Sequence, residues 1–277
     1  MHSTLVESAV TLRAADGIEI PGLFANPTTP AVHSVLMLHG ITTHKNEFGN
    51  FYGDMASSLA TNGVASLRID FRGHGDSQVD SRQFSIASQV LDATAAKDWL
   101  LNETGISKVH VIGSSFGAPP SLFLALRAGS EVATLNLICP VLDYDATFLR
   151  PSTDWARELF SKAAIEAAFQ SGFLCMDGGF QIDVKLLLEM EMIRPYEILA
   201  QALVPTLIIH GEADSMVPYS VSAKYVSSMR PSVQLIGIPH MDHGFNDEDD
   251  ETGQSPASRR NFNLIVKTLL DHIRRSS

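Results

Sequence analysis

Three residues of this sequence could act together as nucleophile, base and orienting acid: Ser115, His243 and Asp214. Ser115 is the centre of a Gly-x-Ser-x-Gly pentapeptide, residues 113–117. A serine hydroxyl is a poor nucleophile near neutral pH, so it needs a base to take its proton and a carboxylate to orient that base. The chain order serine, acid, histidine is typical of such residues on loops that follow the strands of one sheet. We therefore predict nucleophilic catalysis by Ser115.

The residues around Ser115 indicate a sharp turn between a strand and a helix. Residues 108–112 are short, β-branched and apolar, which is typical of a buried strand, and residues 118–128 are rich in alanine and leucine, which favours a helix. In that setting the serine is held in a strained turn with its hydroxyl exposed, and the flanking glycines leave room for it. The alternative is a small-residue turn that only lets a helix pack closely on a sheet.

The acid and the base each have competitors. Asp214 lies on the loop after a predicted strand, where it could instead cap the next helix. Asp143, just past an earlier strand, is a rival acid, and Glu212 is too close to its strand. His243 is favoured over His240 because a glycine follows it and permits a bend. The two histidines also suggest a metal site, but no ligand motif such as H-E-x-x-H accompanies them, so we predict no metal.

Backbone N–H groups are expected to stabilise the oxyanion that forms when a serine attacks a carbonyl, each worth roughly 3–4 kcal/mol. We predict one donor at Phe116, directly after the nucleophile, and the other at Ile41, directly after His39-Gly40. A second glycine-containing cluster, residues 70–77, matches neither a dinucleotide fingerprint nor a P-loop. We expect this cluster to support the His39-Gly40 loop from behind.

The composition excludes several classes of protein. The chain has 277 residues, of which 45% are hydrophobic, so it can build a large core, and its net charge of −11 argues against nucleic acid or a membrane surface as partner. Residues 1–10 carry neither a basic start nor a long apolar run, so we predict no signal peptide and no membrane span. The two cysteines, Cys139 and Cys175, are too few for a disulfide framework. We therefore predict a cytoplasmic protein.

Strand and helix patterns alternate along most of the chain. The sequence predicts strands at 9–14, 18–25, 34–38, 64–70, 108–112, 134–139, 204–210 and 233–238, and helices at 51–61, 85–101, 118–128, 219–229 and 258–274. Such alternation implies an α/β fold with a mostly parallel sheet that is covered by helices on both faces. The carboxyl ends of its strands are where ligands bind in such sheets.

One segment breaks the alternation. We interpret residues 143–201 as an inserted helical cap above the strand ends, and residues 1–142 and 202–277 as the α/β core. One helical pattern covers 155–169 and another covers 186–193. The aromatic and methionine content of the cap suits a largely apolar substrate, although about half of these side chains would only pack the cap onto the core. The side chains that we assign to substrate binding are Trp155, Phe160, Phe173 and Met190.

Five segments in this order resemble the α/β-hydrolase superfamily, and they are 38–40, 70–77, 113–117, 210–218 and 242–245. Within it, the sequence is similar to the cinnamoyl and feruloyl esterases and to their serine aminopeptidase-like and monoglyceride-lipase-like relatives. The resemblance implies a triad of Ser115, Asp214 and His243, an oxyanion hole at Ile41 and Phe116, and no cofactor. Ser114 stands where these relatives commonly have His, and Ala118 where they have Gly.

The function predicted from the sequence is hydrolysis of a small-molecule ester through an acyl-enzyme. A thioesterase or an acyltransferase of a biosynthetic pathway is the alternative within enzymes, because the same triad serves each of these reactions. An alternative of another class is a receptor that binds a small ligand in the same pocket without turnover. The sequence leaves both a monomer and a homodimer open.

Overall fold

A single mixed sheet forms the centre of the molecule. The computed structural model describes residues 5–276, so part of the N-terminal segment for which we predict no signal peptide lies outside the described residues. The strands are β1 (Leu5–Arg13), β2 (Glu19–Pro27), β3 (His33–Leu38), β4 (Val64–Ile69), β5 (Val109–Ser114), β6 (Val132–Ile138), β9 (Thr206–Gly211) and β10 (Val233–Ile238). The sheet has eight strands in the order β1-β2-β4-β3-β5-β6-β9-β10. The β1–β2 and β2–β4 pairs are antiparallel and the other pairs are parallel. The predicted fold class is confirmed.

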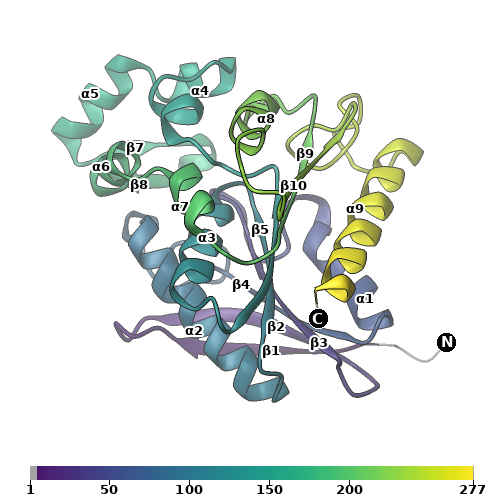
Figure 1. The fold of residues 1–277 in the computed structure, drawn as a ribbon. Coiled ribbons are helices and arrows are strands. Elements are labelled where there is room, and N and C mark those ends of the chain that lie inside the picture. Colours follow the sequence, from purple (N-terminus) through teal and green to yellow (C-terminus); the bar gives the residue numbers. More distant parts are fainter. Residues whose placement is uncertain (1–4, 277) are drawn as a thin grey trace.

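Helices cover both faces of this sheet. They are α1 (Phe51–Thr61), α2 (Ile86–Thr104), α3 (Ala118–Arg127), α8 (Tyr219–Val226) and α9 (Pro256–Arg275). Figure 1 shows α1 and α9 on one side of the sheet and α2 and α3 on the other. Each face has its own apolar core, one beneath α1 and α9 and the other beneath α2, α3 and α8. In the part of the chain that the structure describes, no helix combines the length and the apolar character needed to cross a membrane.

The element ends follow local chemistry. The Ser85 hydroxyl accepts the N–H of Ser88 and so caps the start of α2, and Gly105 ends that helix with φ 68°. The β1–β2 turn places Gly17 at φ 88°, the left-handed conformation that an Asp-Gly pair favours. The predicted strands and helices of the core therefore appear within a few residues of their expected ends, because the caps and turns are encoded locally.

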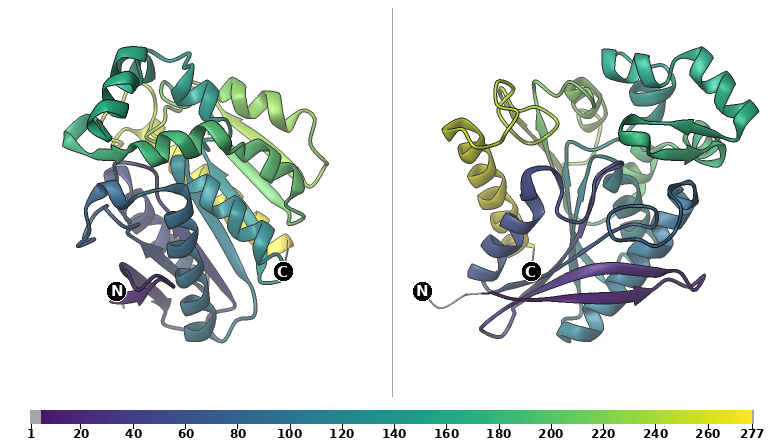
Figure 2. Two further views of the ribbon diagram at one scale, coloured as in Figure 1. Left: turned by 90° about the vertical axis from the view of Figure 1, so that its left-hand side faces the viewer. Right: turned by 180° about the vertical axis from the view of Figure 1, so that it is seen from behind.

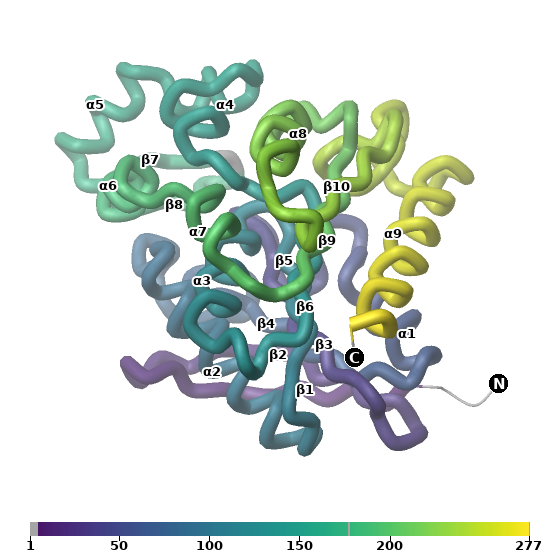
Figure 3. Tube along the Cα trace, in the orientation of Figure 1, coloured from purple at the N-terminus to yellow at the C-terminus, as the bar shows by residue number. Residues whose placement is uncertain are grey.

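The segment from 143 to 201 is less helical than predicted. It contains η4 (Asp145–Leu149), α4 (Asp154–Leu159), α5 (Lys162–Ser171), β7 (Phe173–Cys175), β8 (Gln181–Asp183), α6 (Val184–Met192) and α7 (Pro195–Gln201). Figure 3 follows the chain from the end of β6 through this segment and back to β9. The single helix predicted over 155–169 is wrong, because the chain breaks at Phe160 and the Ser161 hydroxyl then caps α5. The short antiparallel β7–β8 pair was not predicted.

This segment is tied to the core by polar contacts. The Glu189 carboxylate of α6 accepts the backbone N–H groups of Ile86 (2.6 Å) and Ala87 (3.4 Å) at the start of α2. The Ser81 hydroxyl donates to the backbone oxygen of Gln181 in β8 at 2.9 Å. Figure 2 shows the segment at the end of the molecule opposite the β1–β2 hairpin. The segment is thus bonded to the α2 side of the fold, and the hydroxyl of Tyr225 in α8 also donates to its Asp143.

Acid is expected to destabilise the fold through His110 of β5. This imidazole is buried, 2% exposed, with its Nδ1 2.9 Å from the Thr134 hydroxyl. Burial lowers the pKa of His110 to about 4. As the pH falls from about 6.5 to 4, His110 of the unfolded chain binds a proton, whereas His110 of the folded chain stays neutral. The free energy of unfolding should therefore fall by about 2 kcal/mol more in the wild type than in His110→Gln. Urea titrations at pH 7.5 and 4.5 measure this difference, and equal losses in both proteins would contradict it.

Candidate active site

The turn that presents Ser115 is tight on both sides. Ser115 follows β5 directly and has φ 47°, a strained conformation for a residue with a side chain. A Cβ atom on Gly117 would lie 2.2 Å from the backbone oxygen of Leu38, and one on Gly113 would lie 2.4 Å from Oγ of Ser121. Larger residues at 113 or 117 would therefore push the helix away from the sheet. The predicted strand, sharp turn and helix around the serine are all present.

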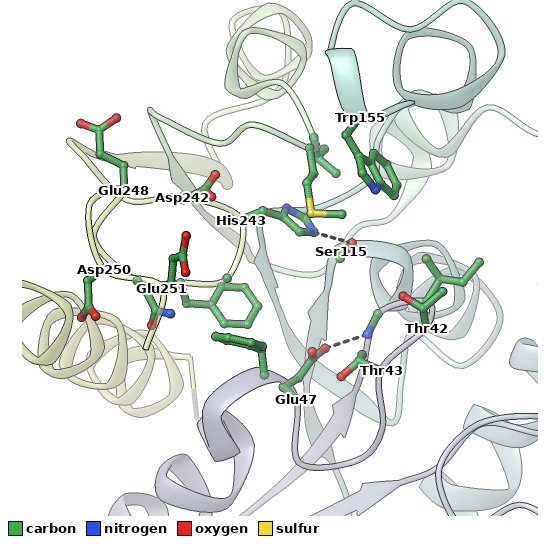
Figure 4. A pocket seen from close by; sticks show the side chains of 18 of the residues that line it. Thr42, Thr43, Glu47, Ser115, Trp155, Asp242, His243, Glu248, Asp250 and Glu251 are labelled. Carbon is green, nitrogen blue, oxygen red and sulfur yellow. Dashed lines mark hydrogen bonds between the residues drawn. The ribbon is translucent and has the colours of Figure 1, made fainter. Parts of the chain in front are cut away.

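The structure brings the three sequence-predicted residues into one hydrogen-bonded chain. Oγ of Ser115 lies 3.0 Å from Nε2 of His243 and is placed to donate to it, as Figure 4 shows. Nδ1 of His243 lies 2.8 Å from Oδ2 of Asp214 and donates its proton to the carboxylate. This network assigns the tautomer of the imidazole. The side chain of Asp214 is fully buried, whereas His243 keeps 13% of its side chain exposed.

Asp214 is held by more contacts than its sequence context suggested. Oδ1 accepts the backbone N–H groups of Met216 (3.0 Å) and Val217 (2.8 Å), so the carboxylate closes its own loop and does not cap α8. Nε2 of His210 lies 3.2 Å from Oδ2 of Asp214. Sequence reasoning treated His210 only as the end of a strand. The feature of the sequence that could have indicated this contact is the position of His210, four residues before Asp214.

The residues that compete for the roles of acid and base contact groups other than Ser115. The Asp143 carboxylate accepts the Tyr225 hydroxyl at 2.5 Å and bonds to the backbone at the start of its own segment. Nδ1 of His240 lies 2.6 Å from the Glu248 carboxylate, on an exposed loop. The side chain of Glu212 packs against β10. The structure thus joins only Asp214 and His243, among these acids and bases, to Ser115.

Electrostatics favour a charge pair between His243 and Asp214. Burial by itself lowers the pKa of His243, but the negative charge of Asp214 and its hydrogen bond, with smaller contributions from Glu47 and Asp242, raise that pKa above its usual value. Burial alone would raise the pKa of Asp214, yet His243 and His210 together hold it well below its ordinary value. The carboxylate therefore stays ionised and stabilises an imidazolium.

The pH dependence of ester hydrolysis should follow from this raised pKa. Only neutral His243 can accept the proton of Ser115, so kcat/KM should rise with pH and reach half its plateau above pH 6.5, the unperturbed value. Hydrolysis of p-nitrophenyl butyrate can be followed at a wavelength where the phenol and the phenolate absorb equally. A midpoint well below pH 6.5 would mean that burial outweighs Asp214.

As predicted, residues of the turn after β4 contact and support the loop after β3. Nε2 of His39 accepts the backbone N–H of Phe71 at 3.0 Å, so its Nδ1–H donates to the backbone oxygen of Gly40 at 2.6 Å. The backbone N–H of Thr42 donates to Nε2 of His74 at 3.2 Å. Burial lowers the pKa of both imidazoles to about 3, so both stay neutral and keep these roles.

A buried ion pair adds to this support. The backbone N–H of Lys45 donates to Asp70 at 2.7 Å, and its ammonium bridges the carboxylates of Asp70 and Asp76, each at 2.6 Å. The turn that follows β4 therefore contacts the loop at two positions, Thr42 and Lys45. A rigid loop is what a preorganised oxyanion hole requires, because its donors must not move as charge develops.

The predicted oxyanion donors lie beside the nucleophile. A Cβ atom on Gly40 would lie 3.1 Å from Cβ of Ser115, so the loop approaches the serine as closely as a glycine permits. Ile41 lines the pocket in front of Ser115, and within residues 5–276 its backbone N–H has no hydrogen-bond partner. Phe116 is the second residue of the short helical turn Ser115–Gly117, and its side chain is fully buried.

A pocket of about 470 Å³ opens in front of Ser115 and His243. Its lining includes several apolar side chains, which are Ile41, Phe48, Phe148, Trp155, Met216, Val217 and Phe245. Figure 4 shows Trp155 across the pocket from Glu47, with Ser115 and His243 between them. The pocket therefore offers an acyl or aryl group an apolar surface next to the serine hydroxyl.

Of the four side chains assigned to substrate binding, the structure places one in this pocket. Trp155 lines it, whereas Phe160, Phe173 and Met190 are absent from its described lining. Phe160 packs behind Phe148, at 5.0 Å between ring centroids, and Met190 is fully buried in α6. Phe173 lies in β7 with the guanidinium of Arg82 above its ring. The break after α4 explains part of this difference, since it turns Phe160 inward.

The acidic run after His243 lies at the pocket mouth. Asp247, Glu248, Asp250 and Glu251 all line the pocket, together with Asp242. Figure 4 shows Asp242, Glu248, Asp250 and Glu251 on the side of His243 away from Trp155. Among the described residues that line this pocket, none is lysine or arginine. The mouth therefore carries a negative field.

A buried thiol is a further neighbour that sequence reasoning missed. Cys139, directly after β6, is a free cysteine with φ 44° and no exposed surface. Its sulfur, a carboxylate oxygen of Asp214 and a ring nitrogen of His243 all lie within 4.8 Å of one another. Burial raises the pKa of this thiol, so it stays protonated. Cys139 therefore packs against the acid and the base as a neutral group.

Comparisons with known proteins agree with this fold. Residues 33–171 match the model of a family described as alpha/beta hydrolase fold. An uncharacterized protein of Rickettsia prowazekii (RP471) is 33% identical over 138 residues, which are 48% of this chain and 57% of that protein. Lipase LipV of Mycobacterium tuberculosis is 32% identical over 129 residues, 46% of this chain and 44% of that protein. These matches thus span about half the length of each relative.

A solved structure is similar over nearly the whole chain. Est1E from Butyrivibrio proteoclasticus, in a structure described as bound to ferulic acid, superposes with a TM-score of 0.76. The match covers 96% of this chain and 100% of that chain at 19% sequence identity. At this identity the similarity establishes the shared architecture.

Proposed function

The chain belongs to the α/β-hydrolase fold family, and from that premise we propose that it is a serine hydrolase that cleaves small, largely apolar esters. The observation that carries the proposal is the hydrogen-bonded chain Ser115–His243–Asp214 beside the pocket. Nucleophile, base and orienting acid are all within hydrogen-bond distance, which is the geometry that acyl transfer needs.

In the proposed mechanism, Oγ of Ser115 attacks the ester carbonyl while Nε2 of His243 takes its proton. The resulting oxyanion is stabilised by the backbone N–H groups of Ile41 and Phe116. The C–O bond to the leaving alcohol then breaks, and the imidazolium of His243 donates its proton to that alcohol. Water attacks the acyl-enzyme in the same way and regenerates Ser115. Asp214 stays ionised throughout and holds the imidazole.

The apolar lining supports an acyl group or an aromatic acid as the part of the substrate that enters the pocket. Phe148 and Trp155 belong to the segment 143–201, which we propose acts as a cap over the active site. The ferulic acid bound to Est1E and the description of LipV as a lipase are consistent with an ester of this kind. Hydrolysis of such an ester needs only the groups already described.

Labelling with a fluorophosphonate tests the proposed function directly. The hydroxyl of an activated serine attacks the phosphorus of the probe and displaces fluoride from it, and peptide mass spectrometry then identifies the modified residue. We expect the label on Ser115 of the native protein and none on Ser115→Ala or on heat-denatured protein. A panel of p-nitrophenyl esters and matched thioesters follows. If Ser115 stays unlabelled and no ester is turned over, the proposal is wrong.

The acidic mouth should select substrates by charge. At low salt we expect kcat/KM for the p-nitrophenyl monoester of succinate to be at least about tenfold below that for the butyrate ester, which has the same chain length. The 4-aminobutyrate ester, with a cationic end, should not be penalised. Raising the salt to about 0.5 M should narrow the gap by screening. A carboxylated substrate that reacts as fast as butyrate would contradict this prediction.

A further inference from the structure

We propose that Glu47 is a positioning residue for the oxyanion hole, because its carboxylate ties the loop that carries Ile41 to the strand end that carries Ser115. This inference rests on the proposed function and adds to it a residue outside the triad and the predicted donors. Sequence analysis gave Glu47 no role. Figure 4 shows its side chain at the floor of the pocket, below Ser115 and beside Thr43.

The geometry joins two separate parts of the site through one oxygen atom. Oε1 of Glu47 accepts the backbone N–H of Gly40 at 2.7 Å. The same oxygen accepts the hydroxyl of Ser114, the residue directly before the nucleophile. Ser114 is fully buried and its hydroxyl also lies 3.4 Å from the backbone oxygen of Leu38. Glu47 therefore fixes the distance between the loop and the nucleophile.

These contacts fix the peptide group that supplies the oxyanion donor. The backbone N–H of Gly40 is held by Glu47, and its backbone oxygen is held by Nδ1 of His39 at 2.6 Å. The peptide bond between Gly40 and Ile41 contains that oxygen and the N–H of Ile41. Because a peptide group is planar, holding the oxygen and the preceding N–H sets the direction of the Ile41 N–H. The donor is thereby aimed before any substrate arrives.

The protein keeps this carboxylate at an energetic cost. Glu47 is 6% exposed, and its backbone has φ 60°, a conformation that L residues seldom adopt. Burial raises the pKa of Glu47 above its ordinary value, although Ser114, Gly40 and His243 oppose that effect. A buried acid in a strained backbone is unfavourable unless its contacts with the surrounding structure compensate for the cost. The Gly40 N–H and the Ser114 hydroxyl, which both donate to Oε1, provide such contacts.

The carboxylate also faces the catalytic base. The ionisable groups around His243 are Asp214, Glu47 and Asp242, whose charges favour the imidazolium, with the neutral thiol of Cys139 and the ring of His210 behind Asp214. Around Glu47 itself lie His243, Ser114, Thr43 and the phenol of Tyr52. Glu47 thus has a geometric effect on the donor and a separate electrostatic effect on His243, and the two can be measured apart.

Two substitutions separate these effects. Glu47→Ala removes both hydrogen bonds and leaves the buried N–H of Gly40 without its acceptor. We expect kcat for p-nitrophenyl butyrate to fall about 10²–10³-fold, as for loss of an oxyanion donor, with KM changed less than about threefold. Glu47→Gln keeps an acceptor oxygen and the shape of the side chain. It should retain kcat within about tenfold, while the acid limb of kcat/KM moves to lower pH because a negative charge facing His243 is gone.

Three further measurements distinguish positioning from a general loss of folding. All rates are expressed per active site titrated with the fluorophosphonate. Binding of a trifluoromethyl ketone, whose adduct with Ser115 carries an oxyanion, should weaken by the same factor as kcat in Glu47→Ala. Ser114→Ala, which removes only one of the two bonds to Glu47, serves as the matched control and should lose less than about tenfold in kcat. If Glu47→Ala does not fold, Glu47→Asp, which cannot reach both donors, replaces it and should lose at least about tenfold.

The inference is overturned if the folded Glu47 variant keeps kcat within about threefold, or if trifluoromethyl ketone affinity is unchanged. It is also overturned if Glu47→Gln loses as much as Glu47→Ala and leaves the pH profile in place. In each of these cases Ser115 still reacts with the fluorophosphonate in the native protein, so the proposed function stands. Failure of that labelling would instead remove the proposed function, and the inference with it.

Discussion

Replacing Ser115 by alanine is expected to lower kcat for p-nitrophenyl butyrate by about a million-fold, close to the background rate. The hydroxyl lies 3.0 Å from Nε2 of His243, and the described pocket offers no second hydroxyl on that nitrogen. Without the covalent step, only water and the oxyanion donors remain, which supply a small part of the rate. Initial rates, measured at enzyme concentrations high enough to see residual turnover, give the size of the loss.

The controls for this variant are its fold and its neighbour. Ser115→Ala relieves the steric demand of a side chain at φ 47° very little, so its thermal midpoint should stay within a few degrees of the wild type. Ser114→Ala, one residue away, should lose less than about tenfold in kcat. Substantial hydrolysis by purified Ser115→Ala, insensitive to fluorophosphonate, would show that another group performs the attack.

Asp214→Asn is expected to lower kcat by about 10⁴-fold with little change in KM. The carboxylate accepts Nδ1–H of His243 at 2.8 Å and stabilises the imidazolium that forms during attack. An amide can present an N–H to Nδ1, which turns the imidazole to the wrong tautomer and leaves Nε2 unable to accept a proton. The rate of p-nitrophenyl butyrate hydrolysis and the rate of fluorophosphonate labelling should both fall.

The chain offers a matched control for this prediction. Asp143 is the rival acid from the sequence, and its carboxylate bonds Tyr225 instead of His243. Asp143→Asn should therefore lower kcat less than about tenfold. If the two substitutions had the opposite ranking, the catalytic acid would be Asp143, and His243 would have to turn toward it during the reaction.

The core and the three central side chains could be predicted because their signals are local. Strand and helix periods, the glycines at 113 and 117 and the position of Asp214 and His243 after two strands can all be found in short windows. Parallel strands bring their carboxyl ends to one edge of a sheet, so residues that follow different strands meet there. That single topological rule links Ser115 to a histidine 128 positions away.

The parts that could not be predicted depend on long-range approach. Glu47 matters only because its loop folds back on Gly40 and Ser114, and Cys139 matters only because β6 ends beside Asp214. Neither residue belongs to a pattern that marks such contacts. The β7–β8 pair has three residues in each strand, too few for a period-two pattern to stand out.

The pocket lining was the least predictable feature. The sequence indicated an apolar cap, and four of its large side chains were assigned to the substrate on composition alone. Which aromatic side chains face the pocket depends on where each short helix begins and ends, and the break at Phe160 changes the orientation of its neighbours. The acidic side of the pocket was hidden for a related reason. A charged run looks like solvated surface until the fold places it next to His243.

For the proposed hydrolysis of an ester, the negative mouth has a consequence at the end of each catalytic cycle. An ester enters without charge, but the acid that it yields ionises near neutral pH and leaves as an anion. Asp242, Asp247, Glu248, Asp250 and Glu251 would repel that anion as soon as it forms. The same carboxylates that discriminate at entry would thus expel the product and keep the enzyme from being inhibited by the acid that accumulates around it.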